Sequence, residues 1–242
     1  MYLIKLRPGE IKKAVKNNTP VILASGSVEY HGPHLPIGTD YLISESIVEE
    51  VEKHIPDGCI VAPGIPFSPT MSWAASPEEG EVDFSPDAMY AYALEVLTQL
   101  TSMGFKRIYI VQHHQGSEGL PSLTLRRAAA TVIRNITKEW GHSWGRGPHE
   151  KLPNPNIFSL IRVAGSDSFS DIPNLEFGHA GKGETQWVMA SHPDTVCMDE
   201  LKTYEGKMPD WLLDADQASV EEGKSWLNAC VNGWVKELTK EL

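Results

Sequence analysis

Side chains able to bind a metal ion gather in one short stretch of the chain, residues 27–40. Its sequence is Ser-Val-Glu-Tyr-His-Gly-Pro-His-Leu-Pro-Ile-Gly-Thr-Asp, and it holds Glu29, His31, His34 and Asp40. It directly follows the apolar run at 21–24, which is typical of a buried strand. Loops beyond strand ends are where α/β proteins place their chemistry. The stretch therefore predicts a metal site at the end of a strand.

The spacing within this stretch suits a pair of metal ions. In an extended chain alternate side chains point the same way, so Glu29 and His31 would lie about 6–7 Å apart on one side. After the turn, the two oxygens of Asp40 could bridge two ions about 3.5–4 Å apart. Mixed histidine and carboxylate ligands favour zinc or manganese. The alternative interpretation is a polar loop, in which Asp40 caps the next helix and the histidines make structural hydrogen bonds.

Composition narrows the class of protein. The 242 residues are 41% hydrophobic and 22% charged, which fits one α/β domain over residues 1–242. A net charge of −11 makes nucleic acid and anionic membrane surfaces poor partners. Neither a signal peptide nor an apolar run of membrane-spanning length is evident, so we expect a soluble cytoplasmic protein. The odd number of widely spaced cysteines predicts buried free thiols at Cys59, Cys197 and Cys230.

The elements expected around the stretch alternate between strands and helices. Apolar runs predict strands at 20–25, 59–62, 107–111 and 157–163. Helical spacing predicts helices at 11–17, 41–54, 87–103, 121–140, 184–191 and 215–240. Residues 63–86 are irregular and rich in proline, which is typical of a functional segment or a subunit contact. Trp73 in this segment is a candidate wall of a substrate site.

Two further polar stretches stand beside the other expected elements. Gln112-His113-His114-Gln115-Gly116 follows the third strand, and His179-Ala180-Gly181-Lys182-Gly183-Glu184-Thr185 opens a later helix. Three polar stretches at element ends favour one common site. The chain has no phosphate-binding loop, no dinucleotide fingerprint and no Gly-x-Ser-x-Gly elbow, which argues against nucleotide binding and serine hydrolase chemistry.

With these residues in view, the chain resembles the creatininase (creatinine amidohydrolase) family. The family's first signature matches residues 27–40 almost throughout, and a second, His-Ala-Gly-x-x-Glu-Thr, matches residues 179–185. The order of elements agrees from about residue 5 to residue 235. The resemblance implies a three-layer α/β/α sandwich around a mainly parallel sheet, and a small-molecule substrate. It also implies a homo-oligomer, usually a hexamer in this family.

By position in these motifs, the resemblance also implies residue roles. One divalent cation, zinc or manganese, would be held by Glu29, Asp40 and His114, and a second by His31, Asp40 and Glu184. His179 would be the proton donor or acceptor beside the reacting bond. His34, apart from the resemblance, is expected to orient the loop rather than to bind a metal.

The chain departs from the family pattern in several places. Relatives commonly read Asn-Gly-His-Gly-Gly-Asn after the third strand, so His113 and Gln115 are unusual and become candidate substrate contacts. Creatininase proper has a glutamate at the position of Gly116. We therefore assign the carboxylate to Glu184, with Glu118 as the weaker choice. The segment 76–80 also lacks the His-x-x-Phe-Pro-Gly-Thr pattern, which argues against creatinine itself as substrate.

The leading hypothesis is a dinuclear metal hydrolase, in which a metal-bound hydroxide attacks a carbonyl of a small cyclic amide or a formamide. A second hypothesis is hydrolytic carbon–carbon ring opening of a keto-inositol, which begins with the same attack. A hypothesis of another class is a non-catalytic metal-binding scaffold. Whether residues 141–156 close over the site is left open by the sequence.

Overall fold

The structure is a computed structural model that describes residues 1–146 and 156–240 of the chain. Within those residues four strands form one sheet, in the order β2-β1-β3-β4, and every neighbouring pair is parallel. The strands are β1 (Val21–Ser25), β2 (Ile60–Val61), β3 (Ile108–Gln112) and β4 (Ile161–Gly165). Each crossover between strands runs through a helix, as parallel pairing requires. Because the strands are parallel, all their carboxyl ends lie on one edge of the sheet.

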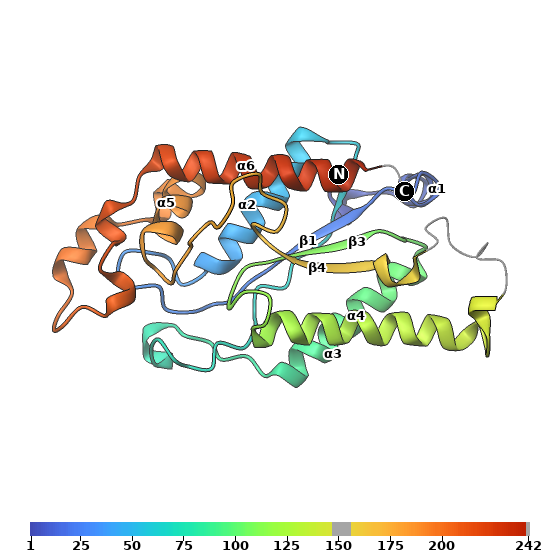
Figure 1. The fold of residues 1–242 in the computed structure, drawn as a ribbon, viewed down its shortest axis with the longest axis horizontal. Coiled ribbons are helices and arrows are strands. Elements are labelled where there is room, and N and C mark those ends of the chain that lie inside the picture. The colour runs from blue at the N-terminus through green and yellow to red at the C-terminus, as the bar shows by residue number, and fades with distance from the viewer. Residues whose placement is uncertain (147–155, 241–242) are drawn as a thin grey trace.

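Helices cover both faces of this sheet, as Figure 1 shows. One layer consists of α2 (Thr39–His54), α5 (Lys182–Ser191) and α6 (Val220–Thr239), and the other of α3 (Pro86–Ser102) and α4 (Leu120–Glu139). A short helix, α1 (Pro8–Lys16), precedes β1. The predicted three-layer sandwich is therefore confirmed, and its sheet is parallel at every described pairing.

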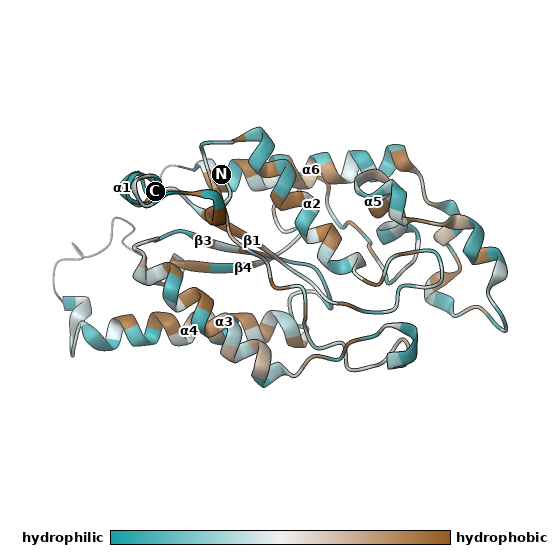
Figure 2. Ribbon diagram, turned by 180° about the vertical axis from the view of Figure 1, so that it is seen from behind, coloured by the Kyte–Doolittle hydropathy of each residue, from teal (hydrophilic) through white to brown (hydrophobic). Residues whose placement is uncertain are grey.

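Alternation along the strands divides the core into two parts. Ile22, Ala24, Tyr109 and Val111 pack with the α2, α5 and α6 layer. Their neighbours Val21, Leu23, Ile108 and Ile110 pack with the α3 and α4 layer. Figure 2 shows the strands largely in brown, whereas the helices carry both brown and teal, as amphipathic elements do. The strands thus form a buried, rigid platform, and chemistry is left to the loops at its edge.

Three sequence predictions need correction. The fourth strand begins at Ile161, because residues 157–159 form a 3₁₀ turn that the Asn156 side chain caps by accepting from the Phe158 amide. The last helix begins at Val220, where the Ser219 hydroxyl caps it. Cys197 is exposed, whereas Cys59 and Cys230 are buried as expected. It lies among the 3₁₀ turns between α5 and α6, where its neighbours Val196 and Met198 pack against the core but its own side chain is exposed.

Two further points bear on the sequence predictions. The sequence left open whether residues 141–156 close over the site, and most of this segment lies outside the described residues. Among the described helices, none is both long enough and apolar enough to cross a lipid bilayer.

Candidate metal centre

The loop after β1 brings two of the predicted ligands into the interior. Gly26 starts it beside α2, where an added Cβ would lie 2.4 Å from the backbone nitrogen of Tyr41, so only glycine fits. The loop closes through a 2.8 Å hydrogen bond from the Glu29 amide to the Ile37 carbonyl. Glu29 and His31 are both 0% exposed. Burying a carboxylate so completely is costly unless a charge of opposite sign compensates it.

Asp40 stands in the first turn of α2 and faces the loop, without capping the helix. It is 1% exposed, and Gly38 occupies the cap position. The Ser27 hydroxyl donates to Asp40 Oδ2, which also lies 3.0 Å from His114 Nδ1. The other oxygen, Oδ1, lies 3.5 Å from His31 Nε2. The two oxygens of one carboxylate therefore face two different histidines.

The loop after β3 delivers His114 in an unusual backbone conformation. His114 has φ 147° and Gln115 has φ 55°, values that side-chain-bearing residues seldom adopt. His114 Nε2 is 3.2 Å from the Pro69 carbonyl, and its Nδ1 is 3.1 Å from Glu29 Oε2. Strained backbone of this kind concentrates at functional sites. In His114 this backbone conformation directs Nδ1 at the carboxylates of Glu29 and Asp40.

The start of α5 contributes Glu184, which is 3% exposed. Its Oε2 accepts a 2.6 Å hydrogen bond from the Ala180 amide and lies 3.4 Å from His31 Nε2. Glu118, the weaker candidate, instead has an 85% exposed side chain that lies 3.8 Å from Arg126. The structure thus brings Glu184 into the cluster and leaves Glu118 at the surface.

These side chains form two groups with the geometry of metal ligands. Glu29, Asp40 and His114 make one group, and His31, Asp40 and Glu184 make the other, with ligand atoms in each within 4.8 Å of one another. Asp40 belongs to both. Among the described residues, His31 Nε2 and both oxygens of Glu29 are buried without a hydrogen-bond partner. Buried polar atoms left unpaired at one point fit a site built for cations.

The charges of the cluster support the same conclusion. Burial by itself lowers the pKa of His31, but the carboxylates of Asp40 and Glu184 outweigh it and raise that pKa to about 10. For His114, Asp40 and Glu29 likewise outweigh burial and raise the pKa to about 10. Burial raises the pKa of Glu29, against the effect of His114. The carboxylates therefore stabilise positive charge at this point, which is what divalent cations would supply.

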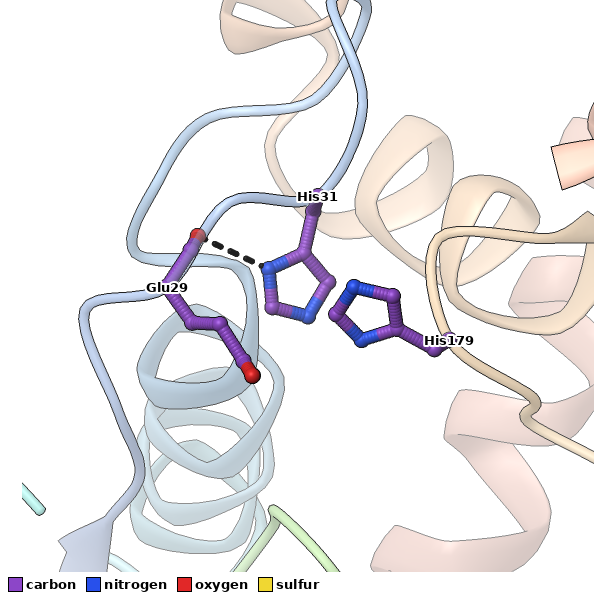
Figure 3. A group of neighbouring side chains, drawn as sticks. All are labelled: Glu29, His31 and His179. Atoms are coloured by element: carbon purple, nitrogen blue, oxygen red, sulfur yellow. Dashed lines mark hydrogen bonds between the residues drawn. The ribbon is translucent and has the colours of Figure 1, made fainter. Parts of the chain in front are cut away.

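His179 lies beside the cluster, on the turn that precedes α5. Figure 3 shows the His31 and His179 rings facing each other, with Glu29 alongside, and the ring centroids are 4.3 Å apart. His179 Nε2 is 2.9 Å from the Tyr30 carbonyl, so it carries the proton and Nδ1 is left with a lone pair. Burial, followed by the charge of His31, lowers the pKa of His179 to about 4. His179 is therefore neutral at pH 7.

The three histidines share one arrangement. His31 Nδ1, His114 Nε2 and His179 Nε2 each lie within hydrogen-bond distance of a backbone carbonyl, those of Glu29, Pro69 and Tyr30. A carbonyl on one ring nitrogen fixes the tautomer and leaves the other nitrogen for a metal or a proton. His179 also forms a third possible metal group with Glu29 and His31. Its ring contacts Trp73 and Trp211, at centroid distances of 4.6 and 4.9 Å.

A cavity of about 560 Å³ opens over the cluster. Its lining includes Asp40, His114, His179 and Glu184, together with Trp73 and Gln115. The Gln115 side-chain nitrogen is buried and has no hydrogen-bond partner in the part of the chain that the structure describes, while its oxygen accepts from the Leu120 amide. His113 also lines the cavity, but both of its ring nitrogens already contact protein groups. The volume is in the range of small-molecule sites.

Some residues of the site escaped the sequence analysis. Ser27 lies within the first motif, and its hydroxyl donates to Asp40, a contact that the motif alone does not predict. Ser166 and Trp211 come from separate loops and contact His113 and His179. Nothing in their local sequence marks them, since only the folded chain brings them close.

The fold and the site together define an α/β/α protein with a buried carboxylate and histidine centre suited to divalent cations. The family model for creatininase, described as creatinine amidohydrolase, matches residues 5–238. The chain therefore belongs to the creatininase family and is a metal-dependent hydrolase, and the predicted family is confirmed.

Individual relatives are distant. The creatinine amidohydrolase of Pseudomonas putida is 21% identical over 245 residues, covering 91% of this chain and 89% of that protein. A 3-dehydro-scyllo-inosose hydrolase of Thermotoga maritima is 23% identical, and the match covers 80% of this chain but 57% of that protein. A mycofactocin precursor peptide peptidase of Mycobacterium ulcerans is also 23% identical, over 80% of this chain and 68% of that one.

Solved structures agree on the fold. A manganese form of creatininase superposes with a TM-score of 0.76 at 18% identity, covering 98% of this chain and 96% of the other. A creatininase of Zn-Zn type superposes with a TM-score of 0.75 at 18% identity, with the same coverage. At this identity the likeness concerns the fold, and the metals belong to those proteins.

Proposed function

We propose that this protein is a dinuclear hydrolase, which binds two divalent cations, zinc or manganese, and cleaves a small polar carbonyl compound such as a cyclic amide or a formamide. One observation carries the proposal. Two groups of ligand atoms share Asp40, and each of its oxygens faces a different group. A bridging carboxylate is what a site for two adjacent ions needs.

The assignment of ligands follows these contacts. Glu29, Asp40 and His114 would hold one cation, and His31, Asp40 and Glu184 the other. Three carboxylates do not fully neutralise two divalent cations, so the loaded site would keep a net positive charge. That charge would stabilise the negative charge that develops on the oxygen of an attacked carbonyl. When bound, such cations lower the pKa of a water molecule towards about 7 and polarise a carbonyl oxygen.

His179 is the proposed proton carrier. Its Nε2 is occupied by the Tyr30 carbonyl, so Nδ1 is the nitrogen that accepts a proton and then returns it to the leaving group. The indole rings of Trp73 and Trp211 both pack against the imidazole, with centroids 4.6 and 4.9 Å from it, and would limit its movement. A neutral imidazole with one free lone pair can act as a base without first losing a proton.

Substrate contacts are proposed on the cavity wall. Trp73 is 49% exposed and lies over His179, so its ring would cover the substrate and exclude water. The unpartnered Gln115 amide nitrogen would donate to a substrate oxygen. The sequence also predicts His113 as a substrate contact, but both of its ring nitrogens contact protein groups, the Ser166 hydroxyl and Glu184 Oε1.

A keto-inositol is the second candidate substrate. Asp167 and Gln115 on the cavity wall offer hydrogen-bonding groups that suit a hydroxyl-rich ring. The reaction would again begin with attack on a carbonyl. The scaffold hypothesis has no support, because the chain belongs to a family of hydrolases and each proposed ligand lies in the cluster.

The decisive experiment combines metal analysis with a substrate panel on one sample. We expect about two zinc or manganese ions per chain, and turnover of one class among cyclic amides, formamides and keto-inositols. Removal of the ions by a chelator should abolish turnover and lower the melting temperature, because the cations bind only the folded state. Failure to bind either metal after reconstitution would contradict the dinuclear site.

Assembly is part of the same proposal. We expect a homo-oligomer, with a hexamer as the form that the family resemblance implies. Exposed apolar side chains such as Ile4 (76%) and Phe158 (70%) are compatible with subunit contacts. Light scattering on the purified protein would give the mass directly, and a monomer at working concentration would contradict this part.

A further inference from the structure

His113 is a buried histidine that the ligand assignment does not use. It is 8% exposed and follows β3 directly, one residue before the ligand His114. Its Nε2 lies 3.1 Å from Glu184 Oε1 and 3.9 Å from Asp40 Oδ1. Its Nδ1 lies 2.8 Å from the Ser166 hydroxyl. The ring therefore joins the cluster to a neighbouring loop.

The contacts decide which nitrogen of His113 carries the proton. Glu184 Oε1 is a carboxylate oxygen and can only accept, so Nε2 must donate to it. In the neutral ring, Nδ1 is then an acceptor, and the Ser166 hydroxyl is the group that donates to it. The hydrogen bond from Ser166 thus keeps the proton on Nε2, where it faces Glu184.

Ser166 is itself fixed in place. It is 2% exposed, its amide donates to the Gln112 carbonyl at 3.1 Å, and its carbonyl accepts from Trp234 Nε1 at 2.9 Å. The His113 ring also packs edge-on against Phe177, with centroids 4.7 Å apart. His113 therefore has little freedom to turn towards a substrate or away from Glu184.

The carboxylate of Glu184 is consequently held at both oxygens. Oε1 faces His113 Nε2 and Oε2 accepts from the Ala180 amide, while Oε2 also lies 3.4 Å from His31 Nε2. Contacts at both oxygens restrict rotation of the carboxylate, which keeps Oε2 close to His31 Nε2, the nitrogen with which it would share a cation. Groups that orient a metal ligand commonly change metal affinity by about 10–100-fold.

We propose that His113 is a positioning residue for the metal centre, which donates from Nε2 to Glu184 and so presets this carboxylate to bind the second cation, with Ser166 selecting the tautomer. This inference rests on the proposed dinuclear function. It assigns His113 to the metal centre, whereas the sequence alone pointed to substrate contact.

The test is a titration of metal-free protein with Zn²⁺ against a chromophoric chelator, for wild type and four variants. His113→Leu removes both ring nitrogens at similar volume, and His113→Gln keeps an N–H donor near the position of Nε2. Ser166→Ala removes the donor to Nδ1. His192→Leu is the matched control, because it makes the same change at the far end of α5.

We expect wild type to bind two ions. In His113→Leu the affinity of one site should fall about 10–100-fold while the other stays within about twofold. His113→Gln should stay near wild type, Ser166→Ala should show a smaller loss at the same site, and His192→Leu should show none. Circular dichroism of the metal-free proteins checks that each variant folds, and Ser166→Ala and His113→Gln carry the test if His113→Leu does not.

Two results would overturn the proposal. Unchanged zinc affinity in His113→Leu would show that Glu184 needs no such support. Equal losses in His113→Leu and His113→Gln, together with a lower coordination number in the absorption spectrum of cobalt-loaded His113→Leu, would make His113 a direct ligand. Neither result touches the dinuclear function, which fails only if the wild type does not bind two ions.

Discussion

Helices α2 and α3, on opposite faces of the sheet, bury very different surfaces. In α2 the buried residues include Thr39, Asp40, Ser44 and Ser46 beside the apolar ones, whereas those of α3 are Met89, Ala93, Leu97 and Leu100. The polar residues of α2 begin at its first turn, at the edge of the sheet where the strands end. The starts of α2 and α5 therefore carry chemistry, whereas α3 contributes packing and α4 buries Ser122 and Thr124 beside apolar residues.

This difference explains how the fold stays stable although the site is destabilising without metal. Buried carboxylates and unpaired imidazole nitrogens destabilise the metal-free fold. The apolar layer of α3 and α4, packed on Val21, Leu23, Ile108 and Ile110, supplies burial that does not depend on the metal. Substitutions in the two layers should consequently fail in different ways.

Asp40→Asn should give the largest effect. The amide cannot bridge two cations, so we expect loss of both ions and a fall in turnover of about 10⁴-fold, equivalent to about 5.5 kcal/mol in the activation barrier. Metal analysis and turnover measure this. Glu50→Gln, on the same helix but at the surface in an ion pair with Lys53, is the control and should change neither. Two tightly bound ions in Asp40→Asn would contradict the bridging role.

His179→Ala should lower turnover by about 10²–10⁴-fold, the range for removal of a general acid or base. Because His179 lies outside the two groups that share Asp40, both ions should remain bound. Metal analysis beside kinetics separates the two roles. If an ion is lost with the imidazole, the third group, Glu29, His31 and His179, is the actual site.

Leu97→Ala tests the other layer, which consists of α3 and α4. Leu97 is 0% exposed in α3, so the substitution leaves a cavity and should lower the free energy of unfolding by about 2–5 kcal/mol. Metal content and turnover of the folded protein at low temperature should stay close to wild type. Leu123→Ala on α4 is the matched control, since Leu123 is 46% exposed and its loss should cost little. Loss of metal in Leu97→Ala would show that the layers are not separable.

Trp73→Ala should have a moderate effect on the site layer. Removing the ring over His179 uncovers the cavity, so we expect KM to rise about tenfold, with a smaller change in kcat. Trp73→Phe keeps an aromatic wall and should recover most of the loss. Steady-state kinetics on the identified substrate measures both. A pure kcat effect would mean that Trp73 serves only to hold His179.

The smallest expected effect concerns the thiols. Burial raises the pKa of Cys59 to about 11 and that of Cys230 to about 12, so both stay protonated and unreactive at pH 8. Cys197 is exposed and should be the thiol that a maleimide labels in the native protein. Mass spectrometry of labelled peptides, with unfolded protein as reference, measures this. Rapid labelling of Cys230 would show that the layer of α2, α5 and α6 opens readily.

The sequence by itself determined the class of the site. Glu29, His31 and Asp40 fall in one short motif whose spacing is local, so their proximity could be argued before any fold was known. Residue pattern also set the strand and helix order, because buried strands leave short continuous apolar runs and amphipathic helices leave apolar residues at helical spacing. The boundaries near residues 157 and 215 were missed, since side-chain caps and 3₁₀ turns there interrupt an apolar pattern that continues through them.

Only the tertiary structure decided how the distant parts meet. Glu184 was already the preferred carboxylate, and the start of α5 brings it to 3.4 Å from His31, while Glu118 lies near Arg126 at the surface. His113 turns to Glu184 and Ser166, because the ends of β3 and β4 are adjacent in the parallel sheet. Such contacts join residues far apart in the chain, and no local pattern encodes them. The motif therefore determines which ligand types the site contains, and the crossovers of the sheet determine how those side chains are arranged.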